Sequence, residues 1–144
     1  MSRWLMDARC AGAAALGTAT LAGWRFTINP EGFGSIAPRP GGCVHGVLWR
    51  LSARDLAAIN AYESVDSGLY LRRQLTVRHG SRHVAALVYI ASQQGKGTPR
   101  PGYIHLVLEA ARDWDLPERY IRSLRRWSPS GWCSVRARDT GEVG

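Results

Sequence analysis

The order of predicted elements favours an α+β domain built on a mixed, partly closed sheet. Segments rich in β-branched and aromatic residues, bounded by glycine and proline, fill much of the first two thirds of the chain. Helical spacing of apolar residues appears once after a strand in the middle of the chain and twice near its end. At 144 residues the chain is long enough to bury a core as one domain. We expect that domain over residues 1–127, and a disordered tail over residues 128–144, which are polar and rich in Gly and Arg.

The expected strands are separated by turns that contain glycine or proline. The first strand alternates loosely, with Leu21, Trp24, Phe26 and Ile28 as its apolar positions. A two-stranded hairpin is expected around the turn at residues 79–81. Turns are expected at 29–32 and 39–42, and strands at 18–28, 34–38, 43–51, 70–78 and 82–91.

The expected helices carry start signals or an amphipathic pattern. Ser52 can cap a helix with its hydroxyl, and Asp55 adds favourable negative charge to the first turn. Pro117 suits the first turn of the last helix because proline lacks the N–H that would be unsatisfied there. Further helices are expected at 2–10, 102–114 and 117–127, with a small-residue linker at 11–17 and a loop at 92–101.

The composition argues against membrane and secreted classes of protein. No apolar run approaches the roughly 20 residues of a membrane-spanning helix, and the N-terminus has no apolar signal region. Cys10, Cys43 and Cys133 are odd in number and share no Cys-x-x-Cys spacing, so we expect reduced thiols in the cytoplasm. A catalytic cysteine remains an alternative, although the sequence shows no obvious histidine partner for one.

The net charge of +8 comes almost entirely from arginine, since Lys96 is the only lysine. A basic protein can bind nucleic acid. The arginines are spread along the chain, and their dense cluster within residues 119–126 is typical of a solvated helix face. Nucleic-acid binding is therefore an unfavoured third hypothesis. The four histidines do not share metal-ligand spacing with cysteines or carboxylates, and we expect no metal or other cofactor.

Glu63 stands where the helix that begins at Ser52 is expected to give way to a loop. A carboxylate held at such a junction between apolar elements can carry acid/base chemistry. Without further context, a lone glutamate at a helix end is more often an exposed, solubilising residue.

The segments around Glu63 resemble the γ-glutamylcyclotransferase family. Val44-His-Gly-Val-Leu-Trp49 is similar to its Val-x-Gly-Val-Leu/Val-Tyr/Trp strand, and Tyr62-Glu63 is similar to its Glu-Gly segment. The similarity covers roughly residues 1–125 and consists of many weak matches in the right order. The other matching stretches are 34–38, 52–56, 70–73, 88–89, 99–103, 110–112 and 116–120.

The resemblance implies a small barrel-like α/β domain with a central pocket and a lyase or acyltransferase reaction of glutathione metabolism. The substrate's α-amino group would attack its own γ-carbonyl, releasing 5-oxoproline and an amine. Glu63 matches the family's catalytic glutamate, Tyr103 a substrate-contacting tyrosine, and Tyr89 a residue that faces the pocket. The implied partner is a small-molecule γ-glutamyl compound, and a homodimer is left open.

Two departures from the family pattern bear on activity. The Tyr-Gly-Ser-Asn fingerprint at the end of the family's first strand has no counterpart, and Ser64 stands where glycine usually follows the glutamate. We therefore expect either a start upstream of Met1 or a relative whose site lacks a loop. The alternative hypothesis is a catalytically impaired relative that keeps the fold as a binding or interaction module.

Overall fold

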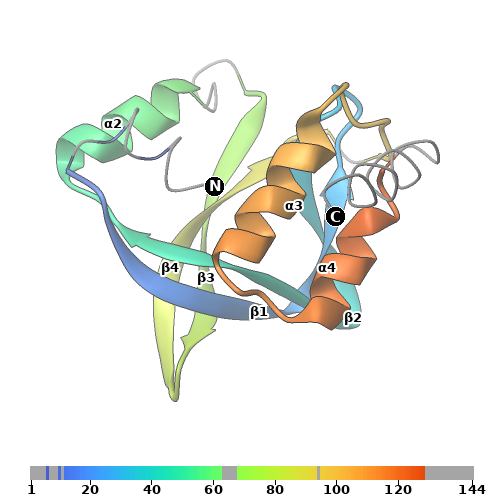
Figure 1. Ribbon diagram of the computed structural model, residues 1–144. Coiled ribbons are helices and arrows are strands. Elements are labelled where there is room, and N and C mark those ends of the chain that lie inside the picture. The colour runs from blue at the N-terminus through green and yellow to red at the C-terminus, as the bar shows by residue number, and fades with distance from the viewer. Residues whose placement is uncertain (1–5, 7–9, 11, 63–67, 94, 129–144) are drawn as a thin grey trace, which may run out of the picture.

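The computed structural model describes residues 6, 10, 12–62, 68–93 and 95–128. Their elements follow the order β1 (Ala14–Ile28), β2 (Gly34–Arg50), α2 (Ala53–Tyr62), β3 (Tyr70–His79), β4 (Arg82–Ala91), α3 (Tyr103–Asp113) and α4 (Glu118–Arg125). The expected tail at 129–144 and most of the expected helix at 2–10 lie outside the described residues. Helices α3 and α4 lie together against one end of the sheet, and α2 lies apart from them (Figure 1).

The sheet has the strand order β2-β1-β3-β4. The α+β class is confirmed, with one difference: all strand pairings in the described chain are antiparallel where we expected a mixed sheet. Short turns join β1 to β2 and β3 to β4, and strands joined in this way must run antiparallel.

Strands β1 and β2 form one long hairpin with two irregularities in its register. The register shifts between Ala15 and Gly17 and between Ala22 and Trp24, where Gly17 and Gly23 have φ angles of 126° and 84°. Such bulges bend a strand and increase its twist.

Two expectations for this hairpin were wrong in part. The expected linker at 11–17 is strand from Ala14 onward, because its small residues pair with Leu48, Trp49 and Arg50. The expected turn at 39–42 does not end β2. These residues lie opposite Gly23, and β2 pairs with β1 both before them, at Pro38, and after them, at Cys43.

The expected β3–β4 hairpin is confirmed. Pairing runs from Tyr70 with Ala91 to His79 with Arg82, which leaves Gly80 and Ser81 as a two-residue turn. Gly80 has a φ of 62°, the left-handed conformation that such turns require.

The start of α2 is a reciprocal cap formed by Ser52 and Asp55. The Asp55 N–H donates to Ser52 Oγ at 3.1 Å, and the Ser52 N–H donates to Asp55 Oδ2 at 3.2 Å. These bonds satisfy donors that the first helical turn would otherwise leave unpaired. The predicted helix start at Ser52 is therefore confirmed.

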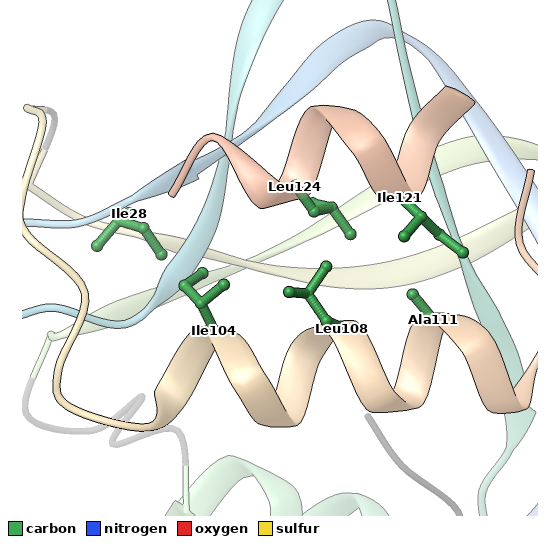
Figure 2. Packing of buried hydrophobic residues seen from close by; sticks show 6 residues of the cluster. All are labelled: Ile28, Ile104, Leu108, Ala111, Ile121 and Leu124. Atoms are coloured by element: carbon green, nitrogen blue, oxygen red, sulfur yellow. The ribbon is translucent and has the colours of Figure 1, made fainter. Parts of the chain in front are cut away.

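The main core joins β1 to α3 and α4. Ile28, Ile104, Leu108, Ala111, Ile121 and Leu124 are buried against one another. Figure 2 shows the α3 and α4 members of this cluster facing each other across the gap between the helices. A second, smaller cluster contains Met6, Cys10 and Ile59, with Trp49 and Tyr89 packed against it.

Candidate active site

An open cavity of about 630 Å³ lies between the strands of the sheet and helix α3. Its described lining is mostly apolar, and Glu31 is the one Asp, Glu, Lys or Arg among the described lining residues. The residues used below that line it are Phe33, Gly34, His45, Leu69, Tyr70, Tyr89, Tyr103, Trp114 and Tyr120. Cavities of this size and character are typical of small-molecule sites.

Tyr103, predicted from the sequence, is the first residue of α3 and lines the cavity. Its hydroxyl oxygen accepts a hydrogen bond of 2.9 Å from the Gly34 N–H. Its ring meets Phe33 edge to face, with centroids 5.7 Å apart. A Cβ at position 34 would lie 2.7 Å from the Tyr103 hydroxyl, so glycine is needed there for this contact.

A second hydrogen bond on Gly34 extends this network to residues that the sequence analysis did not identify as part of a site. The Tyr70 hydroxyl donates to the Gly34 carbonyl at 3.1 Å and accepts from Asn29 Nδ2 at 3.2 Å. Asn29 is 4% exposed, and its Oδ1 accepts from the N–H groups of Glu31 and Phe33. The turn signal at 29–32 predicted this loop, but no local signal indicated that Asn29 would bond a cavity tyrosine.

The loop before α3 is hydrogen-bonded to the end of β1 and to the turn that follows it. The Gly97 N–H donates to the Ile28 carbonyl at 2.9 Å, and the Arg100 N–H donates to the Gly32 carbonyl at 3.1 Å. Arg100 Nε also donates to the Glu31 carbonyl at 2.9 Å. These bonds position the chain immediately before Tyr103.

Tyr89, the other predicted tyrosine, reaches the same cavity from β4. Its hydroxyl donates to Asn60 Oδ1 on α2. Its ring also packs against the cluster around Ile59. Tyr89 therefore connects the cavity to the helix that precedes Glu63.

Glu63 lies within residues 63–67, outside the described residues. The described chain leaves α2 at Tyr62 and returns at Leu69 and Tyr70, both of which line the cavity. The structure thus brings Tyr89 and Tyr103 to one cavity, while the position of Glu63 stays a prediction.

At the α4 side of the cavity, burial shapes the electrostatics of His45 and Tyr120. Burial lowers the pKa of His45, so its imidazole is neutral at neutral pH. Burial also raises the pKa of Tyr120 to about 12. The two rings lie 4.8 Å apart and are tilted by 49°. This wall therefore offers neutral polar groups rather than charge.

The described residues contain no group of three or more His, Cys, Asp or Glu side chains that could hold a metal ion. In the same part of the chain, no helix is long and apolar enough to cross a membrane.

Comparison with known proteins links this chain to a family. A model described as the AIG2-like family matches residues 43–124, more than half of the chain. Mouse γ-glutamylcyclotransferase is 27% identical over 101 residues, which cover 69% of this chain and 53% of the mouse protein. The cow protein of the same name is 26% identical over 70% of this chain and 54% of its own length. The chain thus spans about half the length of these curated relatives.

Solved structures share the fold at low identity. A γ-glutamyl cyclotransferase superposes with a TM-score of 0.81 at 21% identity, covering 90% of this chain and 83% of the other. An uncharacterized protein from Homo sapiens superposes with a TM-score of 0.79 at 23% identity, covering 87% of this chain and 80% of the other.

Proposed function

The chain belongs to the AIG2-like family, and we propose that it is a γ-glutamylcyclotransferase-type enzyme. It would release 5-oxoproline from a γ-glutamyl amine or amino acid. The observation that carries this proposal is the single cavity lined by both Tyr89 and Tyr103, with Leu69 and Tyr70 lining it just after the segment that contains Glu63. The relatives named γ-glutamylcyclotransferase support the same reaction class.

The proposed reaction needs little machinery because nucleophile and electrophile belong to one molecule. The enzyme mainly holds the substrate folded, so that its α-amino nitrogen lies against its γ-carbonyl carbon. A C–N bond forms between these two atoms, and the original γ-amide C–N bond breaks. The products are 5-oxoproline and the free amine, with no oxidation or reduction.

We assign the proton transfers to Glu63. Its carboxylate would take one proton from the substrate's ammonium group, and the resulting acid would give that proton to the leaving nitrogen as the γ-amide C–N bond breaks. The attacking nitrogen loses a second proton when it becomes the amide nitrogen of 5-oxoproline, and the regenerated carboxylate would pass this proton to the released amine, which leaves as an ammonium ion. The apolar lining of the cavity favours this role, because desolvation raises the pKa of a carboxyl group and makes it a better proton donor near neutrality. In this proposal Tyr89 and Tyr103 contact and orient the substrate.

Cys43, one of the described cysteines, is an exposed free thiol. Free thiols suit a reducing compartment, and we propose the cytoplasm as the site of the reaction.

The experiment is an assay of 5-oxoproline release from a panel of γ-glutamyl amines and γ-glutamyl amino acids. Glu63→Gln should lower kcat by about 100-fold or more, the usual effect of losing a general acid/base. Glu109→Gln is the matched control, because Glu109 is 50% exposed on α3 and pairs with His105. Tyr103→Phe should raise KM more than it lowers kcat if Tyr103 only binds substrate.

Three results would contradict the proposal. The first is that the wild-type chain releases no 5-oxoproline from any member of the panel. The second is that Glu63→Gln retains full activity. The third is that Glu109→Gln is impaired as strongly as Glu63→Gln, which would indicate a general charge effect.

A further inference from the structure

A second, smaller pocket of about 80 Å³ lies where β1, β2 and the loop after β4 meet. Its described lining includes Arg25 and Thr27 from β1, Ser35 from β2, and Gln93 and Lys96 from the loop. No carboxylate is among the lining residues that the structure describes. The pocket therefore combines two basic and several polar residues with the apolar Ile36, Ala37 and Ala91, whereas the cavity next to α3 is mostly apolar.

Arg25 and Lys96 form no ion pair with a carboxylate of the residues that the structure describes. The ion pairs found among the described residues are His105 with Glu109 and Arg125 with Glu118. Arg25 and Lys96 come from segments far apart in the sequence but line one small space. Two like charges repel each other unless an anion lies between them.

Buried hydroxyl groups complete the lining. Thr27 is 8% exposed and lines the pocket. The Ser35 hydroxyl, also 8% exposed, accepts from the Ala91 N–H at 2.9 Å, which leaves its own proton available for donation. A hydroxyl group that lines a pocket can donate a hydrogen bond to a ligand bound there.

The loop that carries Lys96 is held in place by its backbone. Gly97 donates its N–H to the Ile28 carbonyl at 2.9 Å. A Cβ at position 97 would lie 1.7 Å from the Asn29 carbonyl oxygen, so no larger residue fits there. The side chain of Asn29 in turn bonds the N–H groups of Glu31 and Phe33. The loop with Lys96 is therefore hydrogen-bonded to the turn that follows β1.

We propose that this pocket binds a phosphate group, held by Arg25 and Lys96 and by the hydroxyls of Thr27 and Ser35. Its volume suits one compact ion. Donors from four side chains match the several acceptor oxygens of a phosphate better than the two oxygens of a carboxylate. The inference is independent of the proposed cyclotransferase reaction, because it uses none of the residues assigned to that reaction.

The test is a titration of the intact chain with inorganic phosphate at low ionic strength near neutral pH, followed by calorimetry and by amide chemical shifts. We expect saturable binding, with the largest shift changes at Thr27, Ser35 and Lys96. Arg25→Gln and Lys96→Gln should each weaken binding by about tenfold, the size expected for one charge-assisted hydrogen bond. Arg25→Lys should restore part of the affinity.

Two controls separate the site from general charge and from misfolding. Arg39→Gln removes an exposed arginine that does not line the pocket and should leave the affinity unchanged. Thr27→Val keeps the side-chain shape but removes the buried hydroxyl, and it should weaken binding several-fold in a chain that still unfolds cooperatively.

Parallel titrations with a phosphate monoester and with acetate define the ligand. Monoester binding that depends on Thr27 supports a phosphorylated small molecule, and binding of the free ion alone supports inorganic phosphate. Acetate binding tighter than phosphate would overturn the proposal. Absence of saturation by about 50 mM phosphate, far weaker than a built site should bind, would also overturn it, as would equal losses in Arg39→Gln and Arg25→Gln.

Discussion

Helices α3 and α4 differ from helix α2 in what attaches them to the sheet. The α3–α4 side is held by a wholly apolar cluster that includes Ile28, Leu108 and Leu124 (Figure 2). The α2 side has a smaller cluster around Ile59 and depends more on directional bonds, namely the Ser52–Asp55 cap and the bond from Tyr89 to Asn60.

This difference suits the cavity that the two sides share. Tyr103 is attached to the strongly packed side, whereas Tyr89 belongs to both the cavity lining and the α2 cluster. Trp49 of the α2 cluster also meets Trp114 of the cavity wall edge to face, with centroids 5.8 Å apart. Apolar burial therefore supplies most of the stability, and hydrogen bonds set the positions of the candidate site residues.

The largest expected effect on stability is that of Leu108→Ala. Leu108 is 4% exposed in the α3–α4 cluster, and its truncation should cost about 2–5 kcal/mol in the free energy of unfolding. The measurement is urea unfolding, with Leu106→Ala as control. Leu106 is 52% exposed on the same helix and should change stability by about 0.5 kcal/mol or less. Equal losses in both variants would contradict the assignment of this core.

Gly34→Ala should have the next largest effect, because its Cβ would lie 2.7 Å from the Tyr103 hydroxyl. We expect a loss of about 1–3 kcal/mol from overpacking, together with a raised KM for the proposed substrate. The control is Gly46→Ala, also on β2, where an added Cβ would meet nothing within 4 Å. If Gly34→Ala keeps both stability and KM, Tyr103 is not held as the structure indicates.

Ser52→Ala tests the directional bonds of the α2 side. Loss of the cap should cost about 1 kcal/mol, less than the core substitution on the other side. The hydrogen bond from the Ser52 hydroxyl is the main cause of the lowered pKa of Asp55. Because the folded state holds the lower pKa, acid protonates Asp55 more readily in the unfolded chain, and stability falls as the pH drops through that lowered pKa.

Acid unfolding curves test whether the cap lowers the pKa of Asp55. In Ser52→Ala the loss of stability caused by protonation of Asp55 should be smaller than in the wild type and should be complete at a higher pH, and in Asp55→Asn this component should be absent. Asp113→Asn, which removes an exposed carboxylate from α3, is the matched charge control. Identical curves for the wild type and Ser52→Ala would show that the cap does not contribute.

The smallest expected effect is spectroscopic and concerns Tyr120 on the α3–α4 side. Its pKa of about 12 should give a late step in the tyrosinate absorbance titration, and Tyr120→Phe should abolish that step. Because the folded state holds the higher pKa, stability should fall between about pH 10, where a tyrosine in the unfolded chain ionises, and pH 12. A titration without a late step in the wild type would show that Tyr120 is more exposed than described.

Elements that depend on near neighbours could be predicted from the sequence. The cap at Ser52 needs only a residue three positions away, and the β3–β4 hairpin needs only Gly80 in its turn. The extension of β1 to Ala14 could not be predicted, because its small residues become strand only through pairing with β2. For the same reason, the continuation of β2 past 39–42 depended on its partner strand.

The sequence by itself therefore determined the cap at Ser52, the β3–β4 hairpin and the family, whereas the roles of Tyr89 and Tyr103 stay predictions. Only the tertiary structure brought Asn29, Tyr70, Gly34 and Tyr103 into one hydrogen-bonded chain. It likewise placed Arg25 and Lys96 in one pocket. Periodicity and capping act over a few residues, whereas the bond from Gly34 to Tyr103 spans 69 positions and forms only when α3 packs on the sheet.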